Sequence, residues 1–263
     1  MRFGAGAANS GAVVRRAEPI TYEIDDYDLP RFVQEAAGFG MDRYAFVVTP
    51  NVDHFVSLQE SASYRALYAQ AAYVLLDSRV VALTLRFLRG LRIPVCRGSD
   101  LTAALITQVV APTDPIVLIG CSDQQAQMLR ERFGLQRLQH HNPPMGFIKD
   151  PAAVEACLQF IESASPFRFC LIAVGNPPGV MVAHMLAERG RARGLALTIG
   201  ASIDFLTGKQ KRAPVWMQQA GLECLYRLIH DPRRLAGRYL VKGPRFFAYL
   251  GAINVVLRPA RPR

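Results

Sequence analysis

Residues 116–133 read IVLIGCSDQQAQMLRERF and contain one complete strand-and-helix unit. The first four residues form a continuous apolar run, which is typical of a strand that is covered on both faces of a parallel sheet. The turn GCSD at 120–123 ends this run, and its Ser and Asp side chains can cap a helix. Residues 124–133 then place apolar side chains at helical spacing. This stretch therefore predicts a buried strand that leads directly into a covering helix.

The same alternation of patterns recurs along the chain. We expect strands at 44–48, 72–76, 116–119, 135–139, 167–174 and 195–199. Helical patterns lie around them at 28–38, 57–71, 80–88, 101–110, 124–133 and 151–164, and a further helix ends at Arg193. Strands that alternate with helices at this spacing predict the α/β class, with a Rossmann-like, doubly wound and mostly parallel sheet of about six strands.

Composition divides the chain into three segments. Residues 1–20 are rich in Gly, Ala and Ser, which predicts a flexible leader. Residues 21–206 form the predicted Rossmann-like catalytic domain. Residues 207–263 form a basic, helical C-terminal appendage: they contain 12 Lys and Arg side chains and two acidic ones, so they carry the whole net charge of +10.

The basic appendage predicts a polyanionic partner, which could be a diphosphate, an anionic membrane surface or a nucleic acid. Nucleic acid is the weakest of these, because aromatic side chains are not interleaved with the charges as stacking platforms. The sequence has no run of about 20 apolar residues and no apolar signal core, which predicts a cytoplasmic protein. The five cysteines are scattered, as expected of free and mostly buried thiols.

Ligands of open α/β sheets bind beyond the carboxyl ends of the strands. That rule gathers residues 49–53, Asp77, 120–123, 175–178 and 200–204 along one edge, where we expect the site. The turn at 120–123 resembles a phosphate-binding turn before a helix, but it lacks a full G-x-G-x-x-G, so a nicotinamide cofactor is not expected.

Asp77 ends the apolar run AYVLLD, where burial can raise the pKa of a carboxyl group. From its position it is either a general base or the N-cap of the following helix, and both readings stay open. His140 and His141 invite a metal site, but adjacent side chains point apart, so a turn is favoured. No acidic D-x-D pair stands at a strand end, and we expect no metal.

Residues 199–238, IGASIDFLTGKQKRAPVWMQQAGLECLYRLIHDPRRLAGR, resemble the C-terminal signature of the WecG/TagA/CpsF glycosyltransferase family. These bacterial enzymes move a sugar from a nucleotide carrier to a lipid-linked acceptor. The resemblance extends more weakly back to about Tyr44, through T-P-N at 49–51 and an Asp at the end of the second strand. It implies that Asp77 deprotonates the acceptor hydroxyl.

The resemblance also implies a set of substrate-binding residues. Thr49 and Asn51 would bind the donor sugar or its phosphate, and the loop RGSDL at 97–101 resembles the family's T-G-S-D-L. The full predicted set is Thr49, Asn51, Arg97, Ser99, Asp100, Gly120, Asn176, Asp204, Arg227, Arg233, Arg234 and Arg238. The four arginines of the appendage would neutralise a diphosphate, because the Arg fork fits phosphate oxygens.

The chain departs from the family pattern in several places. Ser78 replaces a Gly, and Val95 aligns with an Arg, so Arg97 either replaces that charge or lies on the solvated surface. Gly179 and Val180 stand where the family carries Gln-Glu. The first hypothesis is an inverting transferase of exopolysaccharide or cell-envelope polysaccharide synthesis, which uses a UDP-sugar and a polyprenyl-diphosphate-linked sugar. The alternative is a diverged, non-catalytic member that binds the lipid-linked intermediate or a partner transferase.

The end of the chain contains a second apolar run at 246–257 among basic residues. It is too short to span a bilayer and suits an interfacial helix, or else it packs on the body as an ordinary helix. The first reading predicts a peripheral protein on the inner face of the cell membrane. A homo-oligomer is also possible on the sequence alone.

Overall fold

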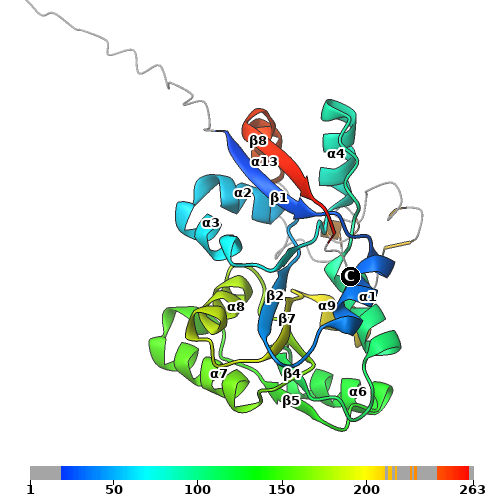
Figure 1. Ribbon diagram of the computed structural model, residues 1–263, viewed down its shortest axis with the longest axis vertical. Helices are drawn as coiled ribbons and strands as arrows, with labels where there is room; N and C mark the ends of the chain where they lie inside the picture. Colours follow the sequence, from blue (N-terminus) through cyan, green and yellow to red (C-terminus); the bar gives the residue numbers. More distant parts are fainter. Residues whose placement is uncertain are drawn as a thin grey trace, which may run out of the picture.

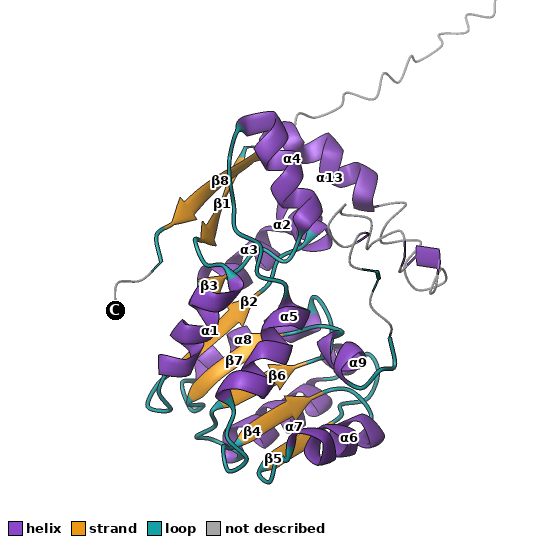
Figure 2. Cartoon of the chain, turned by 90° about the vertical axis from the view of Figure 1, so that its right-hand side faces the viewer, coloured by secondary structure: helices purple, strands orange, loops and turns teal. Residues whose placement is uncertain are grey.

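The structure is a computed structural model that describes residues 19–210, 213–214, 217, 226, 228–229 and 242–260. A parallel sheet of six strands lies between two layers of helices, and a second sheet of two strands covers one end of this body (Figures 1 and 2). The predicted Rossmann-like α/β fold is confirmed.

The main sheet has the order β3-β2-β7-β6-β4-β5, and every pair of neighbours is parallel. Its strands are β2 (Tyr44–Val48), β3 (Tyr73–Val74), β4 (Ile116–Ile119), β5 (Leu138–His141), β6 (Phe169–Ile172) and β7 (Gly194–Thr198). The chain leaves β4 toward β5 on one side and leaves β6 toward β7 on the other. The sheet therefore has a topological switch point between β4 and β6, where ligands bind in this class.

Helices cover both faces of the sheet with separate apolar cores. On one face lie α2 (Val52–Glu60), α3 (Ala62–Ala69), α7 (Pro151–Ser163) and α8 (Pro178–Arg189). The helix α4 (Arg79–Arg89) buries Val81 and Leu85 in the same core but lies at the end of the body that carries the small sheet (Figures 1 and 2). On the other lie α1 (Leu29–Gly38), α5 (Gly98–Ala104), the π-helix η1 (Leu105–Val109), α6 (Asp123–Phe133) and α9 (Ser202–Leu206). The short 3-10 helix η2 (Phe147–Lys149) precedes α7.

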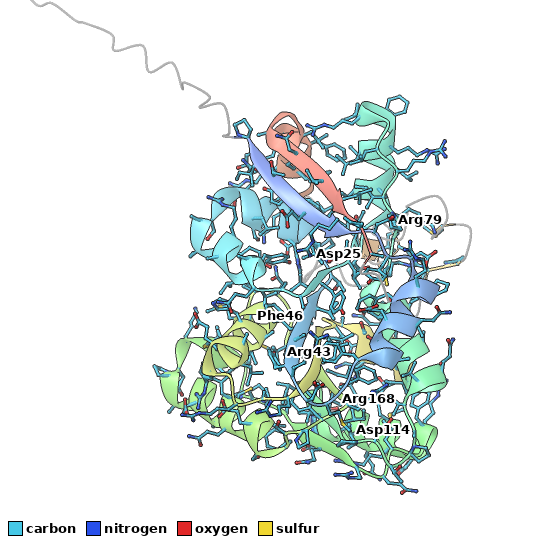
Figure 3. All side chains as sticks on the ribbon, in the orientation of Figure 1. Asp25, Arg43, Phe46, Arg79, Asp114 and Arg168 are labelled. Carbon is cyan, nitrogen blue, oxygen red and sulfur yellow. The ribbon has the colours of Figure 1, made fainter. Side chains whose placement is uncertain are left out.

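The second sheet joins two segments from opposite ends of the described chain. It pairs β1 (Ile20–Asp25) with β8 (Ile253–Arg258) in parallel. Before β8 come the helix α13 (Gly243–Tyr249) and the 3-10 helix η4 (Leu250–Ala252). Asp25 lies where this small sheet meets the main body (Figure 3). Ile20, which composition assigned to the leader, is the first residue of β1.

The run 246–257 is not the single helix that its apolar pattern predicts. It is helical only as far as Ala252 and then continues as β8, because a strand partner is available in β1. Phe246 and Ile253 are fully buried, and the Phe246 ring packs edge-on against Phe55 of α2. This run therefore packs on the body, as the second of the two sequence readings had it.

Three other differences are local. The helix predicted at 57–71 is two helices, since Ser61 caps α3 through the N–H of Tyr64. The helix predicted at 101–110 begins at Gly98 and becomes a π-helix at Leu105. His140 and His141 lie in β5 instead of a turn. Of the helices that the structure describes, none combines the length and the apolar character needed to cross a bilayer.

Candidate active site

Two predicted residues, Thr49 and Asp77, meet at the carboxyl end of the strands β2 and β3. Thr49 follows β2, is buried and donates a hydrogen bond of 3.3 Å to the carbonyl oxygen of Thr198, at the end of β7. Asp77 is half-buried, and its N–H donates 2.9 Å to the carbonyl oxygen of Pro50. These bonds hold the ends of three neighbouring strands at one place.

Gly98 begins α5 against this pair of side chains. A Cβ atom added at Gly98 would lie 3.1 Å from Thr49 Oγ1 and 3.6 Å from Asp77 Oδ2. The absence of a side chain thus lets the backbone of α5 approach both residues closely. The structure brings together Thr49, Asp77 and the start of the RGSDL loop, as the sequence predicts.

Asp77 is not the N-cap of α4. The cap is Ser78, whose hydroxyl oxygen accepts a 3.2 Å hydrogen bond from the N–H of Val81. The residue that replaces the family's Gly therefore starts this helix. Asp77 stands one residue before this cap and three residues after the end of β3, so the N-cap interpretation is wrong and the general base stays a prediction.

Cys96 is buried in the core and lies within the electrostatic influence of nearby carboxylates. Burial raises the pKa of the Cys96 thiol far above its usual range, and the nearby carboxylates of Asp77 and Asp100 raise it further. Cys96 is therefore a neutral thiol at physiological pH and takes no part as a nucleophile.

Arg97 is neither solvated nor available as a separate positive charge. Its Nε lies 2.7 Å from Asp100 Oδ2, and each side chain is only about one fifth exposed. The sequence proposed both residues for substrate binding, and the structure places them as an ion pair at the start of α5. Ser99, between them, is half-buried.

Asn51 and Asn176 lie along the same edge, toward the face covered by α2 and α3. Asn51 caps α2, because its side-chain oxygen accepts a 3.0 Å hydrogen bond from the N–H of Asp53. The side-chain oxygen of Asn176 accepts a hydrogen bond from the hydroxyl of Tyr64. Asn176 Nδ2 is buried and has no hydrogen-bond partner among the described residues.

Gly120 lies at the switch point between β4 and β6. It has a positive φ of 89°, and a Cβ atom there would lie 3.1 Å from the carbonyl carbon and oxygen of Ala173. Only glycine permits this approach of the two strand ends. Ser122 then begins α6 with a capping box to Gln125.

Asp204 is joined to the start of α6 by a hydrogen bond from Gln125, a residue that the sequence did not mark as part of the site. Gln125 Nε2 donates 2.9 Å to Asp204 Oδ1 and 3.1 Å to Thr207 Oγ1, and Lys209 Nζ lies 3.7 Å from Asp204. Gln125 is buried. No pattern in the sequence marks a Gln on a helix as a partner of a residue 79 positions later.

Burial and the Asp204 carboxylate raise the pKa of the neighbouring Cys121 thiol to about 12. Cys121 is therefore a second neutral thiol beside the predicted edge. A cavity of about 350 Å³ lies between α6 and α9, lined by Met128, Leu129, Glu131, Arg132, Leu206 and Thr207. It adjoins this corner but contains none of the predicted site residues.

The edge thus carries two groups of predicted residues. Thr49, Asp77 and the Arg97–Asp100 pair form one, and Gly120 with Asp204 forms the other; α5 packs against α9 and joins them. Arg227, Arg233, Arg234 and Arg238 lie outside the described residues. Within the described ranges, no three His, Cys, Asp or Glu side chains gather as metal ligands do.

The two adjacent histidines serve structural contacts on opposite faces of β5. His140 Nε2 lies 2.9 Å from the carbonyl oxygen of Gly120, and its Nδ1 lies 3.2 Å from Asp123. The His141 ring stacks on Phe160, with 5.1 Å between centroids. The two side chains diverge, as expected of neighbours in a strand.

Comparison with protein families adds an independent finding to this geometry. Residues 18–259 match the model described as the glycosyl transferase WecG/TagA/CpsF family. The match covers most of the chain and includes both groups of edge residues.

Proposed function

The chain belongs to the WecG/TagA/CpsF glycosyltransferase family, and from this premise we propose the reaction that it catalyses. Membership makes it a glycosyltransferase of cell-envelope polysaccharide synthesis. We propose that the donor is a UDP-sugar, that the acceptor is a sugar linked to polyprenyl diphosphate, and that transfer inverts the anomeric centre. The glycan is an exopolysaccharide or another envelope polysaccharide, and the enzyme works at the inner face of the membrane.

The observation that carries the proposal is the place of Asp77. Its carboxylate stands at the end of the β3 segment beside Thr49 and Gly98, and Ser78 performs the capping that Asp77 would otherwise provide. In the proposed step, Asp77 accepts the proton of the acceptor hydroxyl as that oxygen attacks the anomeric carbon. The bond from the anomeric carbon to UDP breaks on the opposite face, and UDP leaves with its electron pair.

The departing diphosphate needs positive charge or hydrogen-bond donors. Arg97 is already paired with Asp100, so it contributes little net charge. We propose that Arg227, Arg233, Arg234 and Arg238 supply that charge in place of a divalent metal. Thr49, Asn51, Ser99 and Asn176 would orient the donor from the strand ends.

The direct test is sugar transfer by Asp77→Asn, which keeps the shape of the side chain and removes its basicity. We expect transfer to a lipid-linked acceptor to fall by at least about 100-fold, as is typical when a general base is lost. Mass spectrometry of the lipid product, with a panel of UDP-sugars, gives the rate and identifies the donor. Asp26→Asn is the matched control, because Asp26 is half-exposed on the surface. Undiminished transfer by Asp77→Asn would remove the base assignment.

A second candidate is a non-catalytic member that binds the lipid-linked intermediate or a partner transferase. This candidate is favoured because Gly179 and Val180 stand where the family carries Gln-Glu, and neither side chain can form the hydrogen bonds of Gln or Glu. Val180 is buried, and a Cβ atom at Gly179 would lie 3.5 Å from the side chain of Ile172, so both positions face the core. Release of UDP on mixing with donor and acceptor supports the transferase, whereas acceptor binding without UDP release supports the second candidate.

A further inference from the structure

The helix α4 exposes an apolar outer face, formed by Leu83, Phe87 and Leu88. These side chains are 46%, 89% and 57% exposed, and Phe87 is thus almost as accessible as in an unfolded chain. A large apolar side chain left in water forgoes the stabilisation that its burial would give. Contiguous exposed apolar side chains of this kind mark an interaction surface.

The outer face of α4 is not the face that attaches the helix to the body. Val81 and Leu85, one turn apart, are fully buried in the core beneath α4. The helix is therefore apolar on two sides, which an ordinary surface helix is not. Its inner side packs in the core, and its outer side is exposed.

The charge around this face selects the kind of partner. No acidic residue occurs between Asp77 and Asp100, whereas Arg79, Arg86, Arg89 and Arg92 all lie in that segment. Arg86 and Arg92 are exposed. Arg79, Leu83 and Arg86 follow one another at helical spacing, which puts arginines beside the apolar side chains. Aromatic and apolar side chains flanked by arginines match an anionic lipid surface.

The position of α4 fits the same partner. Arg89 Nη2 donates 2.5 Å to the carbonyl oxygen of Leu250 and ties the end of α4 to the segment after α13. The two helices lie at the end of the molecule that carries the small sheet (Figures 1 and 2). At a rise of 1.5 Å per residue, Phe87 lies roughly 12 Å along the helix axis from Arg79, the first residue of α4.

We propose that the outer face of α4 is the surface on which this protein docks on an anionic membrane. Leu83, Phe87 and Leu88 enter the interfacial layer, and Arg86 and Arg92 meet the lipid phosphates. The proposal rests on the proposed function for the lipid-linked nature of the acceptor. Docking would also position the site. The helix α4 begins two residues after Asp77, so docking through α4 fixes the distance from the Asp77 carboxylate to the lipid headgroups. The acceptor diphosphate lies among those headgroups.

Vesicle flotation tests the docking surface without any catalytic turnover. The full-length protein is mixed with equimolar phosphatidylglycerol and phosphatidylcholine vesicles, or with phosphatidylcholine alone. We expect Phe87→Ser to lower the partition coefficient on anionic vesicles about tenfold, because one buried aromatic side chain is lost. Arg86→Glu with Arg92→Glu should lower it further and abolish the preference for anionic lipid.

The control is Met145→Ser, since Met145 is fully exposed in the loop after β5, far along the chain from α4. It should float like the wild type. Asp77→Asn should also float normally, so that a failure of the proposed chemistry is distinguishable from a failure of docking. Equal flotation of Phe87→Ser and wild type overturns the proposal.

Two further outcomes would assign this face to another occupant and overturn the proposal. If sedimentation velocity shows a dimer that Phe87→Ser converts to a monomer, with vesicle binding unchanged, the face is an interface between copies. If Phe87→Ser lowers Tm and leaves flotation unchanged, the face is covered within the chain.

Discussion

At the scale of single residues, Asp77 and Ser78 divide two tasks that one side chain often combines. Ser78 is buried and caps α4, which leaves Asp77 at the strand end beside Thr49. A carboxylate that capped a helix would have its oxygen directed at backbone N–H groups and would be a weaker base. The exchange of the family's Gly for Ser at this position thus stabilises the helix without altering the predicted base.

Ser78→Ala tests this division. Loss of the cap should destabilise the protein by about 1 kcal/mol, whereas Ser78→Gly should cost only a few tenths, because Gly is tolerated at an N-cap. For a domain of this size, 1 kcal/mol corresponds to a fall in Tm of about 2–4 °C. The two variants should retain similar sugar transfer below their Tm. A loss of transfer in Ser78→Ala with unchanged Tm would show that Ser78 acts on substrate.

At the scale of elements, Asp25 fastens the small sheet to the main one. Its Oδ2 accepts hydrogen bonds from the N–H of Val74, at 2.6 Å, and from Arg258 Nη2, at 2.7 Å. The Asp25 side chain is 8% exposed. One carboxylate therefore links β1, β3 and β8, and β3 is the strand that leads to Asp77.

Asp25→Ala should destabilise the protein by about 3 kcal/mol, because it leaves a buried N–H and a partly buried guanidinium without their acceptor. Asp25→Asn keeps an oxygen for Val74 and loses the charge, so it should cost less than the alanine variant. Urea denaturation gives both values. Equal stability of wild type and Asp25→Ala would mean that the small sheet is held by its apolar contacts alone.

The helices α7 and α8 are joined by an ion pair with a defined pH dependence. Arg189 Nη1 lies 2.7 Å from Glu155 Oε2. Hydrogen bonds from Arg189, and to a smaller extent from Gln159, lower the pKa of Glu155 below its ordinary value of 4.5. Since the folded-state pKa is the lower one, the pair stabilises the fold fully above about pH 4.5. That stabilisation is lost as the pH falls through the folded-state pKa.

Glu155→Gln should therefore lower Tm at neutral pH and have no effect once the pH lies below the pKa of Glu155. Tm measured from pH 7 to pH 3 for wild type and variant gives the difference. Glu131→Gln is the control, because the Glu131 side chain is exposed and bonded to Gln127. A constant difference across this range would contradict the assignment.

At the scale of the whole molecule, we predict transfer that needs no divalent metal, because the donor diphosphate is assigned to arginines of the appendage. EDTA should leave the rate within about twofold, whereas loss of the phosphate-binding arginines should reduce it by orders of magnitude. The measurement is transfer with purified protein in EDTA, then with added magnesium or manganese. Activity that EDTA abolishes and either metal restores would refute the prediction.

Most of the main sheet could be predicted because its strands are locally marked. Runs such as residues 44–48 and 116–119 are continuously apolar, so each strand identifies itself without its neighbours. β1 was missed and β8 was assigned to a helix, because each strand depends on a partner from the other end of the chain. In β1, Glu23 and Asp25 also interrupt the apolar pattern.

The candidate site divides in the same way. The positions of Asp77 and Thr49 after strands could be predicted from the apolar runs that precede them, and their roles stay predictions. The pairing of Arg97 with Asp100 and the bond from Gln125 to Asp204 depend on side-chain directions that no local pattern encodes. The loop sequences indicated which residues lie at the edge of the sheet. Only the fold showed which of these residues form ion pairs or hydrogen bonds with other side chains.

The parallel pairing of β1 with β8 has a consequence for biosynthesis. Ile20 pairs with Ile253, so the first strand leaves the ribosome roughly 230 residues before its partner. At about 5–20 residues per second, this delay lasts roughly 10–50 s. During that time β1 lacks its partner strand, and an unpaired strand edge is a template on which another chain can pair.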